Sequence, residues 1–275
     1  MVLSLPPGIA TVWLNVGAFV NPVLPPSNDF TVAVVAFEPI SKTRERIAAY
    51  CEDQETRICN STAVRMSGRQ CSICDRLIVI GAAVSNYSSL GTMQLFNYGG
   101  VASSLSPANT ALKATTFTRR TGEMTKSHLP RWMQSSGIAQ RHLEPYKGIV
   151  NEHVPVLSFA AMLDAIPSDI DLPYAKLDMQ GHDFLAFASA GRAARRLQYV
   201  AHECWEDGST PFYAGVSNFF NADWKPHMQS VGFRLHAKHQ AWGHRRQQIH
   251  IQELDIQWVR DDVDRRKWVW PGTPI

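Results

Sequence analysis

Asp178, Gln180 and His182 stand at alternate positions where a short apolar segment, Tyr174–Met179, ends. Such a segment predicts a buried strand, and ligands of open parallel sheets collect outside the carboxyl ends of the strands. A carboxylate there can orient a hydroxyl group or take its proton. We therefore interpret Asp178 as a candidate catalytic base, with Gln180 and His182 beside it. The alternatives are that Asp178 caps the next turn and that His182 is structural.

Two earlier positions suit a nucleoside ligand. Glu38 follows the apolar run Thr31–Phe37, and a carboxylate just after a strand can accept both ribose hydroxyls. Gly17 follows Thr11–Val16, where a glycine lets backbone N–H groups approach a ligand closely. The alternatives are an ordinary strand-end acid at Glu38 and a simple turn former at Gly17.

These residues require a parallel sheet to position them. Tyr174–Met179, a helix opening at His182–Asp183 and a strand at Leu197–Cys204 form a strand-helix-strand unit, which implies a parallel pair. Thr11–Val16, Thr31–Phe37 and Leu77–Val84 are the other expected parallel strands, and the crossover rule places Thr11–Val16 beside Tyr174–Met179. The remaining expected elements are helices at Ser41–Cys51, Ser158–Ile166 and Asp223–Val231, and an antiparallel strand pair at Phe233–His239 and Gln247–Val259.

This order predicts an α/β fold: a three-layer, Rossmann-like sheet, mostly parallel, with an antiparallel C-terminal hairpin. The 275 residues, 45% apolar and 19% charged, suffice for one domain over residues 1–260. A net charge of +3 argues against nucleic acid as a partner, and no apolar run approaches a membrane span. We expect a soluble protein. No signal peptide is visible, and the compartment stays open, with an organelle or lumen if an upstream segment was removed.

Two segments stand apart from this domain. Residues 99–150 are irregular and hold seven Lys/Arg against two Glu. We interpret them as an insertion that is a solvated surface loop, a basic lid over an anionic or sugar-like substrate, or a nucleic-acid contact. The tail, residues 261–275, contains Trp268 and Trp270 and either docks on its own domain or binds a protein partner.

Four of the five cysteines fall close together: Cys51, Cys59, Cys71 and Cys74. Zinc ribbons show two close pairs, whereas Cys51 and Cys59 lie eight residues apart, so we assign no metal ligands. Disulfides, free thiols and zinc binding stay open from the sequence.

Several segments together resemble the FkbM-type family of S-adenosylmethionine-dependent methyltransferases. WLNVGA at Trp13–Ala18 is similar to the first-strand motif of the family, AFEP at Ala36–Pro39 to its second-strand acid, and KLDMQGHDFLAF at Lys176–Phe187 to its Lys-Ile-Asp signature. AAVSNYSSLGTMQLF at Ala82–Phe96 resembles its third strand and edge hairpin. HE at 202–203 and the C-terminal strands follow in the same order, so the resemblance covers most of the chain.

The resemblance implies methyl transfer from S-adenosylmethionine, by direct displacement, to a hydroxyl of a sugar or natural-product-like small molecule. Asp178, Gln180 and His182 would then be the acceptor-side residues. The cofactor-binding residues that the resemblance implies are Asn15, Gly17, Ala18, Glu38, Ala83, Val84 and Ser85.

The chain departs from the family at the first motif. Asn15 stands where the family has Asp, and Asn21 where it has a second Gly. Pro22, Pro25 and Pro26 then prevent the helix whose start ordinarily binds the carboxylate end of the cofactor. Two hypotheses follow: an active methyltransferase, or a methyltransferase-like pseudoenzyme that serves as a structural or binding subunit of a larger assembly.

Overall fold

The computed structural model describes residues 3–19, 21–59, 72–95, 150–211, 213, 215–246 and 249–264. Its strands are β1 Thr11–Val16, β2 Val32–Phe37, β3 Leu77–Ile80, β4 Ala83–Ser85, β5 Ser89–Leu95, β6 Val150–Ser158, β7 Asp171–Leu177, β8 Leu197–Trp205, β9 Phe233–Arg246 and β10 Ile249–Arg260. Its helices are α1 Ser41–Cys59, α6 Phe159–Ala165, α7 Asp183–Ser189 and α8 Lys225–Ser230, with 3-10 turns η1 Cys74–Arg76 and η3 Gly191–Arg196 and a π-helical turn η4 Phe220–Trp224.

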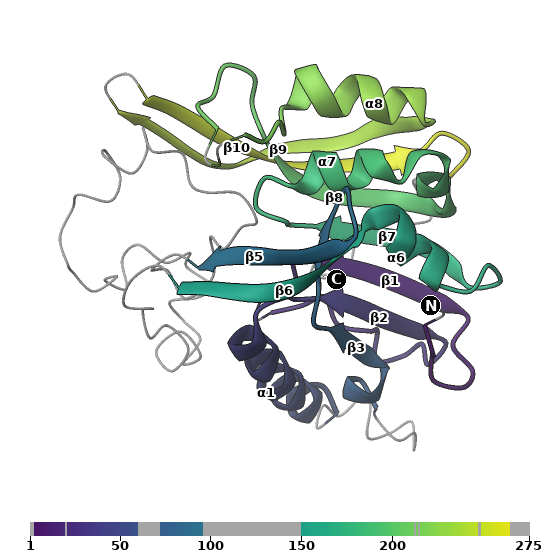
Figure 1. Cartoon of the computed structure of the whole chain (residues 1–275). Helices are drawn as coiled ribbons and strands as arrows, with labels where there is room; N and C mark the ends of the chain where they lie inside the picture. The colour runs from purple at the N-terminus through teal and green to yellow at the C-terminus, as the bar shows by residue number, and fades with distance from the viewer. Residues whose placement is uncertain are drawn as a thin grey trace.

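Seven strands form one mixed sheet in the order β3-β2-β1-β7-β8-β10-β9 (Figure 1). The pairs from β3 to β8 are all parallel, whereas β10 runs antiparallel to both β8 and β9. The predicted parallel sheet with an antiparallel C-terminal hairpin is therefore confirmed. So is the central position of β1, which pairs with β2 on one side and with β7 on the other.

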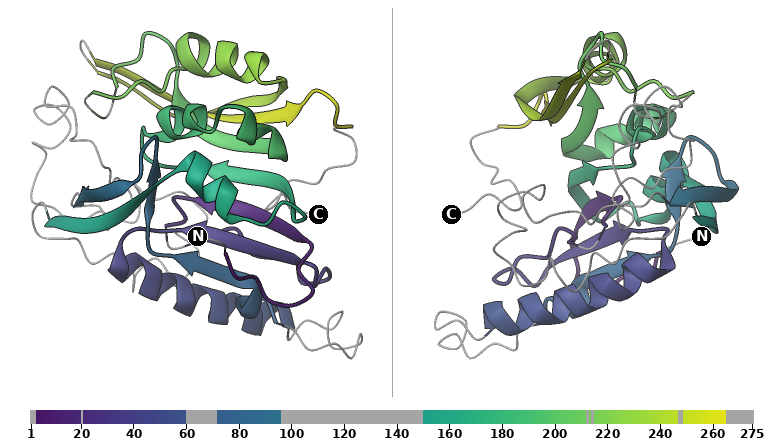
Figure 2. Two further views of the ribbon diagram at one scale, coloured as in Figure 1. Left: turned by 45° about the vertical axis from the view of Figure 1, so that its right-hand side comes forward. Right: turned by 90° about the vertical axis from the view of Figure 1, so that its left-hand side faces the viewer.

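Helices α6, α7 and α8 lie on one face of this sheet, and α1 lies on the other face beside β2 and β3 (Figure 2). On one face the core contains Phe159 of α6, Phe187 of α7 and Met228 of α8. On the other face Ala36 of β2 packs against Ile47 of α1. Burial on both faces explains why the parallel strands are almost uniformly apolar rather than alternating.

The third predicted strand, Leu77–Val84, is wrong as a single element. β3 ends at Ile80, whose carbonyl accepts hydrogen bonds from the N–H groups of Glu38 and Ala82. The second bond folds the chain into a tight turn at Gly81, and a Cβ at that glycine would meet the Arg44 guanidinium at 2.9 Å. After the turn, β4 leaves the main sheet and joins a second sheet of order β4-β6-β5.

Other predicted boundaries also shift. The strand predicted at Tyr174–Met179 is Asp171–Leu177, so Asp178 follows the strand rather than belonging to it. The helix predicted from Asp223 begins earlier, with η4, because the Asp223 carboxylate reaches back to accept the Phe219 N–H at 2.7 Å. Residues 96–149, which hold most of the predicted insertion, and residues 265–275 of the predicted tail lie outside the described residues.

An irregular loop replaces the crossover helix between β1 and β2, as the three prolines predict. Arg76 fastens this loop to the sheet. Its guanidinium donates to the carbonyl groups of Pro26, Asp29 and Val32 at 2.7–2.9 Å and stands over the Phe30 ring. Charge-assisted bonds therefore supply the anchoring that the apolar face of a helix would otherwise provide.

None of the helices in the described ranges is long and apolar enough to cross a membrane. Among the same residues, no group of three or more His, Cys, Asp or Glu is arranged to hold a metal ion.

A disulfide joins Cys51 of α1 to Cys74 of η1, with 5.8 Å between their Cα atoms. Glu55 supports this junction, since its carboxylate accepts the N–H groups of Ile73 and Cys74 at 3.1 and 3.2 Å. The disulfide therefore ties α1 to the start of the edge strand β3. Cys204 is a buried free thiol, while the Cys71 position and the Cys59 side chain lie outside the described part.

Reducing this disulfide, or the substitution Cys74→Ser, should lower the free energy of unfolding by about 2–4 kcal/mol, because the cross-link restricts the unfolded chain. Urea unfolding with and without reductant measures the change. A matched Cys59→Ser/Cys71→Ser variant should remain sensitive to reductant, and an insensitive wild-type chain would contradict the pairing.

Candidate functional site

The turn after β1 packs directly on the end of β7. Gly17 has a φ of +75°, and a Cβ added there would lie 1.8 Å from the Asp178 carbonyl oxygen. In addition, the Asp178 N–H donates to the Val16 carbonyl at 2.9 Å. The fold thus brings Gly17 and Asp178 together at the middle of the sheet, as the sequence predicts.

The backbone donors of this turn are already engaged within the chain. The N–H groups of Gly17 and Ala18 both donate to the Phe37 carbonyl, at 3.0 and 3.1 Å. The Phe19 N–H donates to Glu38 Oε2 at 2.9 Å, and Phe19 itself adopts a left-handed φ of +47°. These three donors point at protein acceptors rather than at an open site.

Glu38 lies at the centre of this arrangement and is only 4% exposed. While Oε2 accepts from Phe19, Oε1 accepts the Ile40 N–H at 2.9 Å. Burial raises the pKa of Glu38 to about 7, even though both hydrogen bonds and the nearby Arg44 favour the charged form. The carboxylate therefore joins the turn after β1 to the turn after β2.

The proline-containing loop covers the neighbouring part of the sheet. Asn15 is buried, and its Oδ1 accepts the Val23 N–H at 2.7 Å. Val23 packs in turn against an aromatic cluster that includes Tyr174, and Pro22 and Pro25 are buried. The Asn15 Nδ2 atom is buried without a hydrogen-bond partner among the described residues. The side chain predicted to serve a cofactor instead holds the loop.

Ala83, Val84 and Ser85, predicted to border a nucleobase, are also buried. Ala83 packs against Val154 and Val156 in the second sheet. The Ser85 Oγ lies 3.3 Å from Nδ1 of His182, which connects β4 to the turn after β7. Burial lowers the pKa of His182 to about 4, so the ring is neutral at physiological pH.

A chain of polar contacts orients Asp178. Gln180 Nε2 donates to Asp178 Oδ1 at 2.9 Å, and the Tyr213 hydroxyl donates to Gln180 Oε1 at 2.6 Å. On the other side, Lys176 Nζ lies 3.6 Å from Asp178 Oδ2. The Asp178 side chain remains 19% exposed, so both of its oxygens are oriented while part of the group can still be reached.

Asp183 caps the turn that carries Gln180. It is buried, and its two carboxylate oxygens accept the N–H groups of Met179 and Gly181 at 2.9 and 3.1 Å. The turn has consecutive left-handed residues, Gln180 at φ +53° and Gly181 at φ +91°. A Cβ at Gly181 would approach the Tyr213 ring to 2.8 Å, so this position also requires glycine. The capping role considered for Asp178 belongs to Asp183.

Further carboxylates surround this chain of contacts. The negative charge of Asp178 raises the pKa of Glu203 well above its usual range, while Lys176 opposes the shift. Burial raises the pKa of Glu253 to about 7, and Asp178 adds to the effect. The carboxyl end of β7 is therefore acidic, with Lys176 as the cation that partly compensates.

No model of a known protein family matches the sequence, and no curated protein matches it either. The candidate site therefore rests on its own geometry. Sequence reasoning had not assigned roles to Tyr213, Asp183 or Lys176. Asp183 stands at the predicted helix start, where an acid is a capping signal, but no local pattern connects Tyr213 to Gln180 across 33 residues.

The close contact at Gly17 predicts that adding a single methyl group there strongly lowers the stability of the fold. Gly17→Ala should destabilise the protein by more than about 3 kcal/mol, because the Cβ overlaps backbone that cannot move aside and the φ is positive. Gly191→Ala is the matched control, since Gly191 also has a positive φ but no atom within 4 Å, and it should lose only about 1–2 kcal/mol. Equal losses in thermal or urea unfolding would contradict the close approach.

The burial of His202 predicts that the folded protein loses stability in acid. It stacks on Trp224 with 3.5 Å between ring centroids, and its Nε2 accepts the Trp258 indole N–H at 2.8 Å. Burial lowers the pKa of His202 to about 3. Between pH 3 and about 6.5 the unfolded chain therefore binds a proton at this residue that the folded chain does not bind. The free energy of unfolding should fall by about 2 kcal/mol from pH 7 to pH 5 because of His202.

The variant His202→Gln keeps an acceptor for the indole and should flatten this part of the stability curve. His239→Gln, at an exposed histidine, serves as the control. Urea unfolding at several pH values measures both. The same acid-induced loss in His202→Gln would show that other groups cause it.

Proposed function

We propose that the chain is a methyltransferase-like protein of the FkbM type that serves as a binding or structural subunit. The strand order β3-β2-β1-β7-β8-β10-β9, with β10 antiparallel, supports the class I methyltransferase layout. So does the meeting of Gly17, Glu38 and Asp178 at the carboxyl edge of the sheet, as the resemblance implies. The Rossmann-like architecture is part of this proposal.

One observation carries the non-enzymatic role: the groups expected to bind S-adenosylmethionine bind the protein itself. Glu38 holds two backbone N–H groups, the Phe37 carbonyl takes those of Gly17 and Ala18, and Asn15 holds the proline-containing loop. All the predicted cofactor residues except Gly17 are buried. In this arrangement they do not fit the cofactor, since a nucleoside would have to compete for the buried Glu38 with the two backbone N–H groups that it already accepts.

Methyl transfer to a small-molecule hydroxyl is the second candidate, and the geometry of Asp178 favours it. A half-buried carboxylate that Gln180 and Lys176 orient on both oxygens is the kind of group that accepts a hydroxyl proton. For this candidate, Asp178→Asn should lower turnover by about 10²–10⁴-fold. Measurable methyl transfer that is unaffected by Asp178→Asn would remove this residue from the reaction.

Calorimetry separates the two candidates. The proposal expects no heat of binding with S-adenosylmethionine at about 1 mM. A dissociation constant in the micromolar range, or about −8 kcal/mol, would overturn it in favour of the enzyme.

Glu38→Gln gives a second test of the same point. If Glu38 is structural, this variant should lower the free energy of unfolding by about 1–3 kcal/mol, because an amide can accept from only one side and its NH₂ group opposes the other backbone donor. Asp29→Asn is an exposed control whose loss should be smaller. Unchanged stability of Glu38→Gln, with weakened ligand binding, would instead assign Glu38 to the cofactor.

A further inference from the structure

β9 forms one edge of the seven-stranded sheet and pairs only with β10 in the part of the chain that the structure describes. Its outer side therefore presents backbone donors and acceptors that face away from β10. β9 is also basic throughout, because Phe233–Arg246 contains four Lys/Arg and three His and no Asp or Glu.

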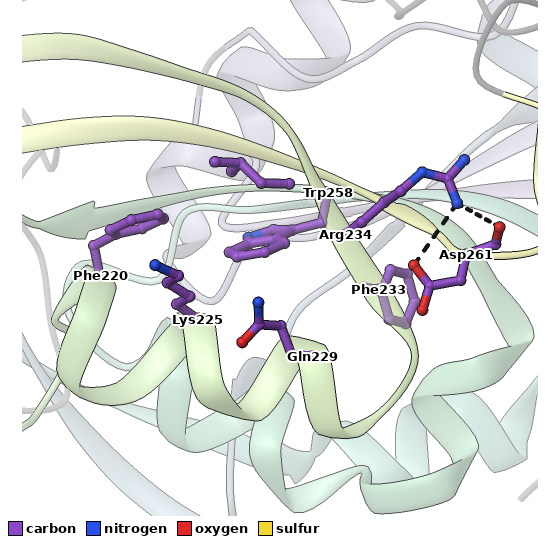
Figure 3. A pocket seen from close by; sticks show the side chains of 8 residues that line it. Phe220, Lys225, Gln229, Phe233, Arg234, Trp258 and Asp261 are labelled. Atoms are coloured by element: carbon purple, nitrogen blue, oxygen red, sulfur yellow. Dashed lines mark hydrogen bonds and ion pairs between the residues drawn. The ribbon is translucent and has the colours of Figure 1, made fainter.

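A groove of about 350 Å³ runs along the first residues of this edge, between β9 and α8 (Figure 3). Phe220, Phe233 and Trp258 contribute aromatic surface to it. Lys225 and Gln229, one turn apart on α8, extend toward it from the helix side. Leu235 of β9 also lines the groove and is 41% exposed.

Within the described part of the chain, some of the basic side chains around this groove have an acidic partner and others do not. Arg234 forms an ion pair with Asp261 at 3.7 Å and donates a hydrogen bond to the Val263 carbonyl at 2.7 Å. Lys238 stands over the Phe220 ring and pairs with Glu206 at 3.3 Å. Lys225 is exposed and has no ion-pair partner among the described residues. The groove thus retains a positive charge beside an apolar surface.

The positive charges of β9 and Lys225 favour some kinds of strand at this edge over others. Two copies of β9 paired edge to edge would bring together two strands that carry only positive charges, which is unfavourable. An extended segment rich in Asp and Glu gains from the same charges. Its alternate side chains would point to one face, where an apolar residue can cover Leu235.

We propose that β9 binds an extended acidic segment of another protein as an added strand, with an apolar side chain of that segment against Leu235 and a carboxylate near Lys225. Main-chain hydrogen bonds to β9 would contribute affinity, and the groove would contribute selectivity. This inference specifies the partner of the proposed binding role. It is argued from the β9 edge and the groove between β9 and α8, so the cofactor experiments above can fail without affecting it.

Fluorescence anisotropy with a labelled ten-residue peptide of Glu that carries Val at one central position tests the proposal, because its groove-facing side then holds both an apolar and acidic side chains. We expect saturable binding that weakens with added salt. A peptide with Lys in place of Glu should not bind, and one with Pro at alternate positions should lose binding because it lacks main-chain donors.

Lys225→Glu and Leu235→Asp should each weaken binding by about tenfold. Arg192→Glu makes the same change in net charge as Lys225→Glu, at an exposed position outside the groove, and should change affinity by less than about twofold. Unfolding curves check that all three variants are folded; both groove positions are exposed, so the substitutions should not disturb the core.

Hydrogen exchange locates the bound peptide. Amides of β9 should gain protection when the Glu peptide with its central Val is present, while amides of the opposite edge strand β3 should not. Absence of binding, binding that Arg192→Glu weakens as much as Lys225→Glu does, or binding without protection of β9 would each overturn the proposal.

Discussion

The buried carboxylate of Glu38 is the contact on which the centre of this protein depends. It accepts one backbone N–H from the turn after β1 and one from the turn after β2. Those two turns lie at the carboxyl edge of the sheet, where an α/β protein ordinarily keeps its ligand. Burial raises the pKa of Glu38, so the two hydrogen bonds offset only part of the unfavourable desolvation of the charged form. In the function proposed above, the same bonds would close the edge against a nucleoside.

The loop between β1 and β2 shows how a fold can lose a helix and keep its core. Three prolines prevent the crossover helix, and polar contacts replace its packing: Asn15 at one end of the loop and Arg76 at the other. Each of these side chains is buried and bonds to backbone atoms of the loop. Such contacts fix one conformation more strictly than an apolar helix face would, since each carbonyl or N–H left unpaired in the interior is unfavourable.

The molecule carries opposite charges at two places. Asp178, Glu203 and Glu253 gather near the carboxyl end of β7. The charge of Asp178, together with burial, raises the pKa of Glu203, and burial raises that of Glu253, with Asp178 adding to the effect. The edge strand β9 instead contains basic residues and no Asp or Glu. An edge with like charges resists pairing with its own copy, while a suitably acidic strand is attracted.

The sequence by itself determined the main architecture. Apolar runs such as Thr11–Val16 and Leu197–Cys204, with one helix between β7 and β8, were enough to predict a parallel sheet. An apolar run indicates that a strand is buried, and the crossover rule limits the order in which the strands can lie in the sheet. The meeting of Gly17 with Asp178 followed from the same rule. Strand ends were less predictable: Leu77–Val84 divides at Gly81 because one carbonyl, that of Ile80, receives two donors from different parts of the chain.

Only the tertiary structure decided what the site residues contact. Asn15 and Glu38 have the chemistry to bind a cofactor, but the structure pairs them with Val23, Phe19 and Ile40. Likewise, Tyr213 reaches Gln180 across 33 residues. A residue type states which bonds a side chain can make, and local patterns state whether it is buried. Which partner it meets depends on how distant segments pack, and that information is not present in any single segment of the chain.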